Sequence, residues 1–260
     1  MKKIKYFLAI ASLLMLAGCF DINEDIDVKA DGKGTFSIHT DMSQLIQAMQ
    51  NYLGKEEMDK QMPTKNMDTT VMMRTLMDTA QGISAENKAL IKDGSVHMKL
   101  NMGEKIFKSD IVIPFSTLAN LQELYNSMNN QSLGFTQLFK VMTGKKDTAA
   151  AGVGAGAEMP DMNQFNAIYD FESRDGLISR KLNADKWKKL KESPQYAQMK
   201  EAGQMGISIP YTLTVKLPRP VKKVDNMLAK LFPDRKTVII QYNLIEVFDH
   251  PEKFEYTIVY

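Results

Sequence analysis

Apolar and polar residues alternate with the two-residue period of a β-strand over much of the chain. In the first such segment, Ile22, Ile26 and Val28 share one face, while amide and acidic side chains share the other. This segment ends at a turn over 31–34, whose glycines accept positive φ angles, and the alternation resumes over 35–42. These residues predict a β-hairpin near the start of the folded region.

A helical spacing follows the hairpin, and the order of hairpin and then helix recurs twice. Apolar residues three and four positions apart predict a helix over 45–53, with Asp41 or Ser43 as its N-cap. The two later rounds predict strands over 96–102, 107–113, 165–171 and 177–182, and helices over 118–125 and 183–190, with a break at Pro194. The rounds share a pattern but no sequence, so they do not form a true repeat.

The last part of the chain is mostly strand. Long alternations cover 207–217, 238–244 and 254–260. Consecutive hairpins favour an antiparallel sheet with helices packed on one face, which is an α+β fold. The length suits a single domain over 19–260 with a flexible Ala/Gly-rich loop at about 144–160, and we expect the strands beyond this loop to join the same sheet.

Residues 1–18 have the layout of a secretory signal peptide, with three early lysines, an apolar stretch over 6–17 and small residues at the end. The apolar stretch is shorter than the roughly 20 residues that cross a membrane. Leu16, Ala17 and Gly18, followed by the chain's single cysteine Cys19, resemble the lipobox of bacterial lipoproteins. The resemblance implies recognition of these three residues by signal peptidase, cleavage before Cys19, and a diacylglycerol and an N-acyl chain on Cys19. A buried N-terminal helix and a plain secreted protein are the alternatives.

The charge of the chain limits the kinds of partner that it can bind. The chain has 33 basic and 31 acidic side chains, and removal of residues 1–18 takes away three lysines, which leaves one acidic charge in excess. The remaining lysines are scattered among acids, so no basic stripe for nucleic acid is present. The sequence also has no second polybasic signal, which leaves the acyl chains as the expected membrane anchor.

No catalytic constellation stands out. The chain lacks Gly-x-Ser-x-Gly, His-Glu-x-x-His and Gly-rich phosphate-binding motifs, and we expect neither catalytic residues nor a bound metal. His39 and His97 fall on the polar faces of predicted strands. If those strands were neighbours, the two rings could approach and share a metal; otherwise both are solvated strand residues.

Methionine is the unusual residue type, with 19 in 260 residues. Met58 and Met62 are four positions apart, as are Met73 and Met77, so each pair would share a helix face. Such side chains pack a core, line an adaptable groove for a lipid-like ligand or a partner, or bind Cu(I). Met49, Met73 and Met77 are the candidates for lining a groove.

Both ends of the chain resemble known lipoproteins. The matching segments are Cys19, Asp31-Gly32-Lys33-Gly34-Thr35-Phe36, Asp41-Met42-Ser43, Tyr211–Pro218, Val221 and Asp234–Val238. They resemble the uncharacterised lipoproteins common in Bacteroidota and, more distantly, the LppM-type lipoprotein domain, whose fold is α+β. The first resemblance implies that Asp21, Glu24, Asp25 and Asp27 act as an acidic signal for export to the cell surface. The alternative is that these acids form the solvated face of the first strand.

The sequence thus leads us to expect a lipid-anchored, non-enzymatic protein of the bacterial outer membrane, facing the periplasm or the cell surface. We expect it to bind a protein partner or an apolar, lipid-like ligand, with no nucleic acid and no cofactor other than the acyl chains on Cys19. The alternative function is an envelope hydrolase or an outer-membrane assembly factor whose site is not visible as a motif.

Overall fold

The computed structural model describes residues 21–44, 47, 66–79, 83–129, 166–204 and 208–260. Their strands form an eight-stranded sheet in the order β10-β11-β8-β1-β2-β5-β4-β3 and a four-stranded sheet in the order β6-β7-β12-β9. The strands of the larger sheet are β1 (Asp21–Val28), β2 (Gly34–Asp41), β3 (Asn66–Met72), β4 (Ser95–Asn101), β5 (Ile106–Phe115), β8 (Pro210–Lys216), β10 (Ala229–Leu231) and β11 (Thr237–Asn243). Those of the smaller sheet are β6 (Tyr169–Arg174), β7 (Leu177–Leu182), β9 (Lys223–Asp225) and β12 (Tyr256–Val259).

Helices complete the described part of the chain. They are α4 (Met73–Thr79), α5 (Ala85–Ile91), α6 (Leu118–Asn129), α9 (Ala184–Lys191), α10 (Pro194–Gln204) and the short 3₁₀ helices η1 (Leu244–Phe248) and η2 (Pro251–Phe254). Among the described strands, β1 and β8 pair in parallel and the other pairs are antiparallel. The expected α+β fold is confirmed.

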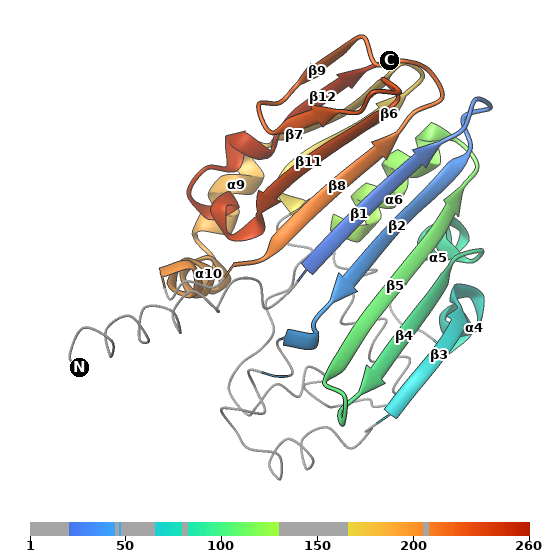
Figure 1. The fold of residues 1–260 in the computed structure, drawn as a ribbon, viewed down its shortest axis with the longest axis vertical. Coiled ribbons are helices and arrows are strands. Elements are labelled where there is room, and N and C mark those ends of the chain that lie inside the picture. The colour runs from blue at the N-terminus through green and yellow to red at the C-terminus, as the bar shows by residue number, and fades with distance from the viewer. Residues whose placement is uncertain (1–20, 45–46, 48–65, 80–82, 130–165, 205–207) are drawn as a thin grey trace, which may run out of the picture.

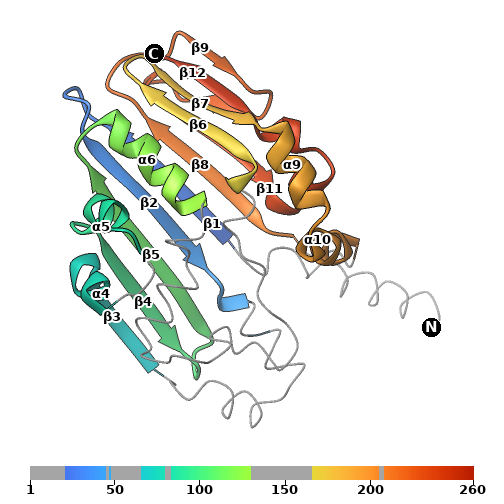
Figure 2. The same ribbon diagram turned by 180° about the vertical axis from the view of Figure 1, so that it is seen from behind.

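The molecule has two layers. The eight-stranded sheet forms one layer (Figure 1). Behind it, α4, α5 and α6 cover the half that contains β2, β5, β4 and β3, and the four-stranded sheet covers the half that contains β1, β8 and β11 (Figure 2). The helices of this arrangement therefore lie on one face of the larger sheet, as expected, and they share that face with the second sheet.

The core lies between the layers. Ile26, Leu213 and Val215 are fully buried there, and side chains of this kind each stabilise the fold by roughly 1.5–3 kcal/mol. The two halves of the second layer meet at Tyr125 of α6, which stacks on Phe171 of β6 with ring centroids 3.8 Å apart. One connected core thus joins the two layers.

The expectation that the later strands join the first sheet is only half right. β8 and β11 extend the larger sheet, but β6, β7 and β12 form a sheet of their own. The pattern did not predict β3, β9, β10, α5, η1 or η2, and α10 begins at Pro194, where a break was expected. The helix expected over 45–53, apart from residue 47, and the loop at 144–160 lie outside the described residues. Within the described residues, no helix has the length and apolarity needed to cross a membrane.

Candidate functional site

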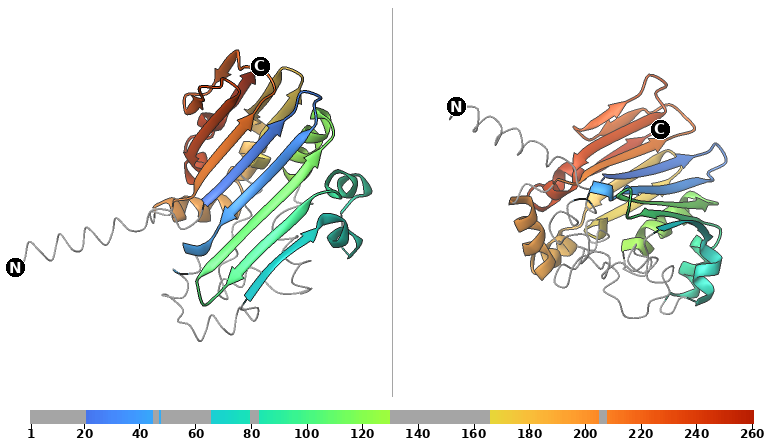
Figure 3. Two further views of the ribbon diagram at one scale, coloured as in Figure 1. Left: turned by 45° about the vertical axis from the view of Figure 1, so that its right-hand side comes forward. Right: turned by 60° about the horizontal axis from the view of Figure 1, so that its bottom comes forward.

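The strands of the larger sheet carry mostly polar residues on the face that points away from the second layer. No described helix covers this face (Figures 1 and 3). Strand register places a row of polar residues across five neighbouring strands, namely Asn23, His39, Asp110, His97 and Thr70. The alternation of each strand turns these side chains to the same face, because residues directly opposite each other in a sheet share a face.

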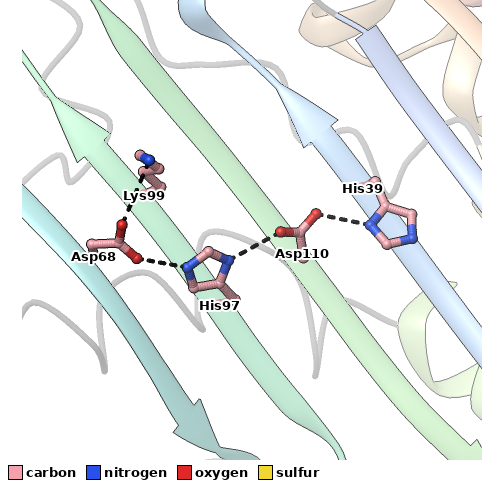
Figure 4. A network of polar contacts seen from close by, with 5 residues as sticks. All are labelled: His39, Asp68, His97, Lys99 and Asp110. Carbon is pink, nitrogen blue, oxygen red and sulfur yellow. Dashed lines mark hydrogen bonds and ion pairs between the residues drawn. The ribbon is translucent and has the colours of Figure 1, made fainter. Parts of the chain in front are cut away.

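Asp110 joins two histidines in the middle of the row (Figure 4). His39 Nδ1 lies 2.8 Å from Asp110 Oδ1, and His97 Nδ1 lies 3.1 Å from Asp110 Oδ2. The outer ring nitrogens meet further carboxylates: His97 Nε2 lies 2.9 Å from Asp68 Oδ1, and His39 Nε2 lies 3.6 Å from Asp25 Oδ2. We call Asp25, His39, Asp110, His97 and Asp68 the His–Asp ladder.

The ladder favours the protonated form of His97. Hydrogen bonds to Asp68 and then to Asp110 raise the pKa of His97 above its ordinary value. The bond from His97 lowers the pKa of Asp68. Partial burial pushes the pKa of Asp110 upward, but the hydrogen bonds from His39 and His97 outweigh it, and the net shift is downward. Lys99 Nζ also lies 3.7 Å from the second oxygen of Asp68.

The position of His97 does not fit a general base that is held by a single carboxylate. A general base needs one ring nitrogen held by a carboxylate and the other free to reach the proton it removes. In His97 both nitrogens already meet carboxylates. The side chains of His97 and Asp110 are also 37% and 40% exposed, so water screens their charges. The ladder is suited to contact with another polar surface and to proton uptake.

The ladder also does not fit a metal site. His39 and His97 are not on neighbouring strands, since β5 separates β2 from β4, and Asp110 fills the space between the rings. The pair of adjacent rings considered from the sequence is therefore absent. Both rings remain partly exposed, with side-chain exposures of 41% for His39 and 37% for His97, and they also meet carboxylates. No group of three or more His, Cys, Asp or Glu residues in the described ranges is arranged to hold a metal ion.

A second polar cluster lies deep between the two sheets. Glu24 of β1 is 1% exposed and Arg180 of β7 is 2% exposed. The Tyr211 hydroxyl donates to Glu24 Oε2, while Arg180 donates to the Tyr242 hydroxyl (Nη2, 2.9 Å) and to the Phe254 carbonyl (Nε, 3.1 Å). Stacked rings of Tyr211 and Tyr242, 4.8 Å apart, connect the acid to the base.

Burial sets the protonation of this cluster. Loss of water raises the pKa of Glu24 from 4.5 to about 6, although Arg180 and the hydrogen bond from Tyr211 act in the opposite direction. Glu24 Oε1 makes no hydrogen bond to any described residue, so its second oxygen is left without compensation. Glu24 is therefore not part of a solvated acidic strand face, whereas Asp25 and Asp27 do lie on the open face.

The structure places the residues singled out from the sequence as follows. Met73 and Met77 lie on α4, 1% and 3% exposed, within the core cluster. This placement agrees with the interpretation as core packing. Met49 lies outside the described residues, as do Leu16, Ala17, Gly18 and Cys19.

Asp110, Asp68 and Arg180 escaped the sequence analysis, and Glu24 was considered there only as part of an acidic export signal. Asp110 looked like an ordinary outward residue of its strand. Glu24 carried a usable signal, because it occupies an apolar-face position between Ile22 and Ile26. Arg180 carried the same signal, since it shares a strand face with the fully buried Ile178.

Comparison with known proteins adds no functional assignment. The chain matches no family model, no curated protein and no solved structure. The function therefore has to be argued from the chain's own residues.

Proposed function

We propose that this chain is a lipid-anchored protein of the bacterial cell envelope that acts, without catalysis, as a binding module for another protein. The observation that carries the proposal is the position of Cys19 in the lipobox-like run, separated from the start of β1 by Phe20 alone. At about 3.3 Å per residue, an acylated Cys19 holds the first residue of β1 within about 10 Å of the lipid. β1 is an inner strand of the larger sheet, so the anchor acts on the body of the domain.

The open face of the larger sheet supports the binding role. Eight strands spaced about 4.8 Å apart, with about 7 residues at about 3.3 Å each, give a face of roughly 800 Å². That is the area one partner contributes to a standard protein interface. The imidazoles and carboxylates of the His–Asp ladder line the middle of this face, which favours a polar protein surface over an apolar ligand. The burial of Met73 and Met77 also argues against an apolar groove lined by these two residues.

Acylation is tested by replacing the single cysteine. Wild-type chain and Cys19→Ser are produced in a Gram-negative host that is fed an alkyne-tagged palmitate. We expect label in the wild type, none in Cys19→Ser, and accumulation of a heavier precursor when lipoprotein signal peptidase is inhibited. An unlabelled wild-type protein, or a mature chain whose mass shows a different first residue, would refute the anchor.

The binding face is tested in the same cells by photo-crosslinking. A photo-crosslinking residue replaces Thr70, at the end of the polar row, and in a matched control it replaces the exposed Ala119 on α6 in the other layer. An adduct of one defined mass at Thr70 and none at Ala119 supports the proposal. No adduct at Thr70, or the same adducts at both positions, contradicts it.

A further inference from the structure

One end of the molecule is defined by the beginning of β1, where the chain enters the sheet from Cys19. Ile22 of β1 lies opposite Tyr211 of β8, and Tyr211 lies opposite Tyr242 of β11. The Tyr242 hydroxyl accepts from Arg180 of the smaller sheet. The level of Arg180 in the smaller sheet therefore coincides with the start of β1, and we call this end of both sheets the anchor end.

Two surface elements converge at the anchor end. The backbone N–H of Leu182, the last residue before the N-cap of α9, donates to Glu255 Oε1 at 2.7 Å. Asn226, which begins the turn between β9 and β10, donates from Nδ2 to the Glu255 carbonyl, also at 2.7 Å. Both elements thus flank Glu255.

The turn presents a large apolar side chain to water. Met227 is 84% exposed, the highest value among the exposed large apolar residues of the described chain. The turn around it is tightly held, since Asn226 Nδ2 also donates to the Lys253 carbonyl at 3.0 Å and Asn226 Oδ1 accepts from the Leu228 N–H at 2.7 Å. Leu228 packs on the core, so Met227 alone of this pair is turned outward. A rigid turn with an outward methionine is suited to insertion into an apolar phase.

α9 supplies basic side chains at the anchor end. α9 carries four lysines and one acid, and its Trp187 and Leu190 pack inward, which turns the lysines to solvent. Lys188 and Lys189 are exposed and make no ion pair with any described residue. Two acids near these elements are ion-paired, because Lys186 binds Asp170 at 2.7 Å and Lys200 on α10 binds Asp249 at 3.1 Å. The lysines in the last turn of α9 interact favourably with the helix dipole. The dipole does not explain why Met227 is exposed.

We propose that the anchor end docks on an anionic lipid surface, with Met227 entering the boundary between headgroups and acyl chains and the lysines of α9 facing the headgroups. The argument from exposure and charge is independent of acylation, and it deepens the proposed function, on which its biological setting rests. It also revises the expectation that the acyl chains are the sole membrane contact, because tertiary structure supplies a second basic and apolar signal.

The test uses a local probe in the full chain. Cys19→Ser leaves no cysteine, so Met227→Cys in this background accepts a single environment-sensitive fluorophore. The matched control is Met72→Cys, an exposed methionine on edge strand β3, at the opposite side of the larger sheet from β10. Both proteins keep the same N-terminal segment, so any membrane binding by that segment is common to them.

Vesicles of phosphatidylcholine with 30% phosphatidylglycerol, and vesicles of phosphatidylcholine alone, are added to each labelled protein. We expect a blue shift and a several-fold rise in intensity at position 227 with the anionic vesicles only, and no change at position 72. Equal responses at both positions would show that the N-terminal segment does the binding, and a probe at 227 that stays in water would exclude insertion. Either result overturns the proposal.

Charge reversal separates the lysines of α9 from general electrostatics. In the Met227→Cys background, Lys188→Glu with Lys189→Glu should raise the lipid concentration for half-maximal response by about tenfold. The control pair, Lys29→Glu with Lys33→Glu, makes the same charge change at the β1–β2 turn, beyond the other end of β1, and should have little effect. Equal losses in both pairs refute a specific docking end. Because every chain in this test lacks Cys19, failure of acylation leaves its outcome unchanged.

Discussion

At the scale of single residues, Asp110 decides what the two histidines on the open face are. Each of its oxygens meets one imidazole, so it converts two separate strand residues into one charged row. His97 then lies between two carboxylates, and its raised pKa follows from that position. Protonated His97 favours the folded state, so this contribution to stability is present at low pH and is lost as the pH rises through the folded-state pKa.

Asp110→Asn tests this dependence. Removing the charge of Asp110 takes away one of the two carboxylates that raise the pKa of His97, so the pKa of His97 should fall toward its ordinary value. The measurement is an NMR titration of the imidazole ring protons. Asp31→Asn in the β1–β2 turn is the control and should leave His97 unchanged. A titration of His97 that is identical in wild type and Asp110→Asn would show that the ladder does not couple these groups.

At the scale of elements, the β1–β2 hairpin shows how local sequence is read correctly. The predicted turn over 31–34 is present, and Gly32 adopts φ +80°, which only glycine accepts readily. Gly34 serves another purpose, because a Cβ there would overlap the Asp27 carbonyl and the Phe115 ring. The glycine at position 34 therefore lets β1, β2 and β5 lie close together.

Gly34→Ala should separate these strands. We expect a loss of about 3 kcal/mol or more in the free energy of unfolding, because the overlap involves backbone and cannot be relieved by a side-chain rotation. Gly103→Ala, in the β4–β5 turn, is the matched control, since its Cβ would meet only Asn101 Oδ1 at 3.4 Å. Urea unfolding of both variants measures the difference. Equal small losses would show that the hairpin shifts to accept the methyl group.

Other elements could not be read from local pattern, for identifiable reasons. β3 has no buried face, since its side chains are exposed or half-buried throughout, so it carries no apolar alternation. β9 and β10 have three residues each, too few for any period to be visible. At Pro194 the chain starts α10, because proline is accepted at the first position of a helix, and the Ser193 hydroxyl accepts from the Tyr196 N–H.

At the scale of the whole molecule, the two sheets are joined through buried polar groups as well as through apolar packing. Arg180 reaches from the smaller sheet to Tyr242 of the larger sheet, beside the Tyr211 that donates to Glu24. Burial keeps Glu24 protonated to a higher pH than in the unfolded chain. The stability that this raised pKa contributes is fully present below pH 4.5 and is lost as the pH rises through 6.

Glu24→Gln should remove that pH dependence. A shift from 4.5 to about 6 corresponds to a loss of about 2 kcal/mol in the free energy of unfolding between pH 4.5 and pH 8. The variant should lack this part of the decline, because glutamine does not ionise. Asp25→Asn, the next residue on the same strand but on the open face, is the control and should keep the wild-type slope. Denaturant unfolding across this pH range decides between them. A wild-type slope in Glu24→Gln would mean that Glu24 is ionised in the folded protein at all these pH values.

The sequence by itself determined the α+β class, most of the longer strands and the hairpin turns, because alternation and glycine conformation are local properties of neighbouring residues. Only the tertiary structure decided which strands lie side by side, since burial of the whole apolar surface selects the strand order. That order brings Asp110 to His39 over 71 sequence positions and to His97 over 13. It also gathers the Met227 turn and the lysines of α9 at the end where β1 begins. No local sequence pattern predicts these contacts, because each one joins residues from different elements.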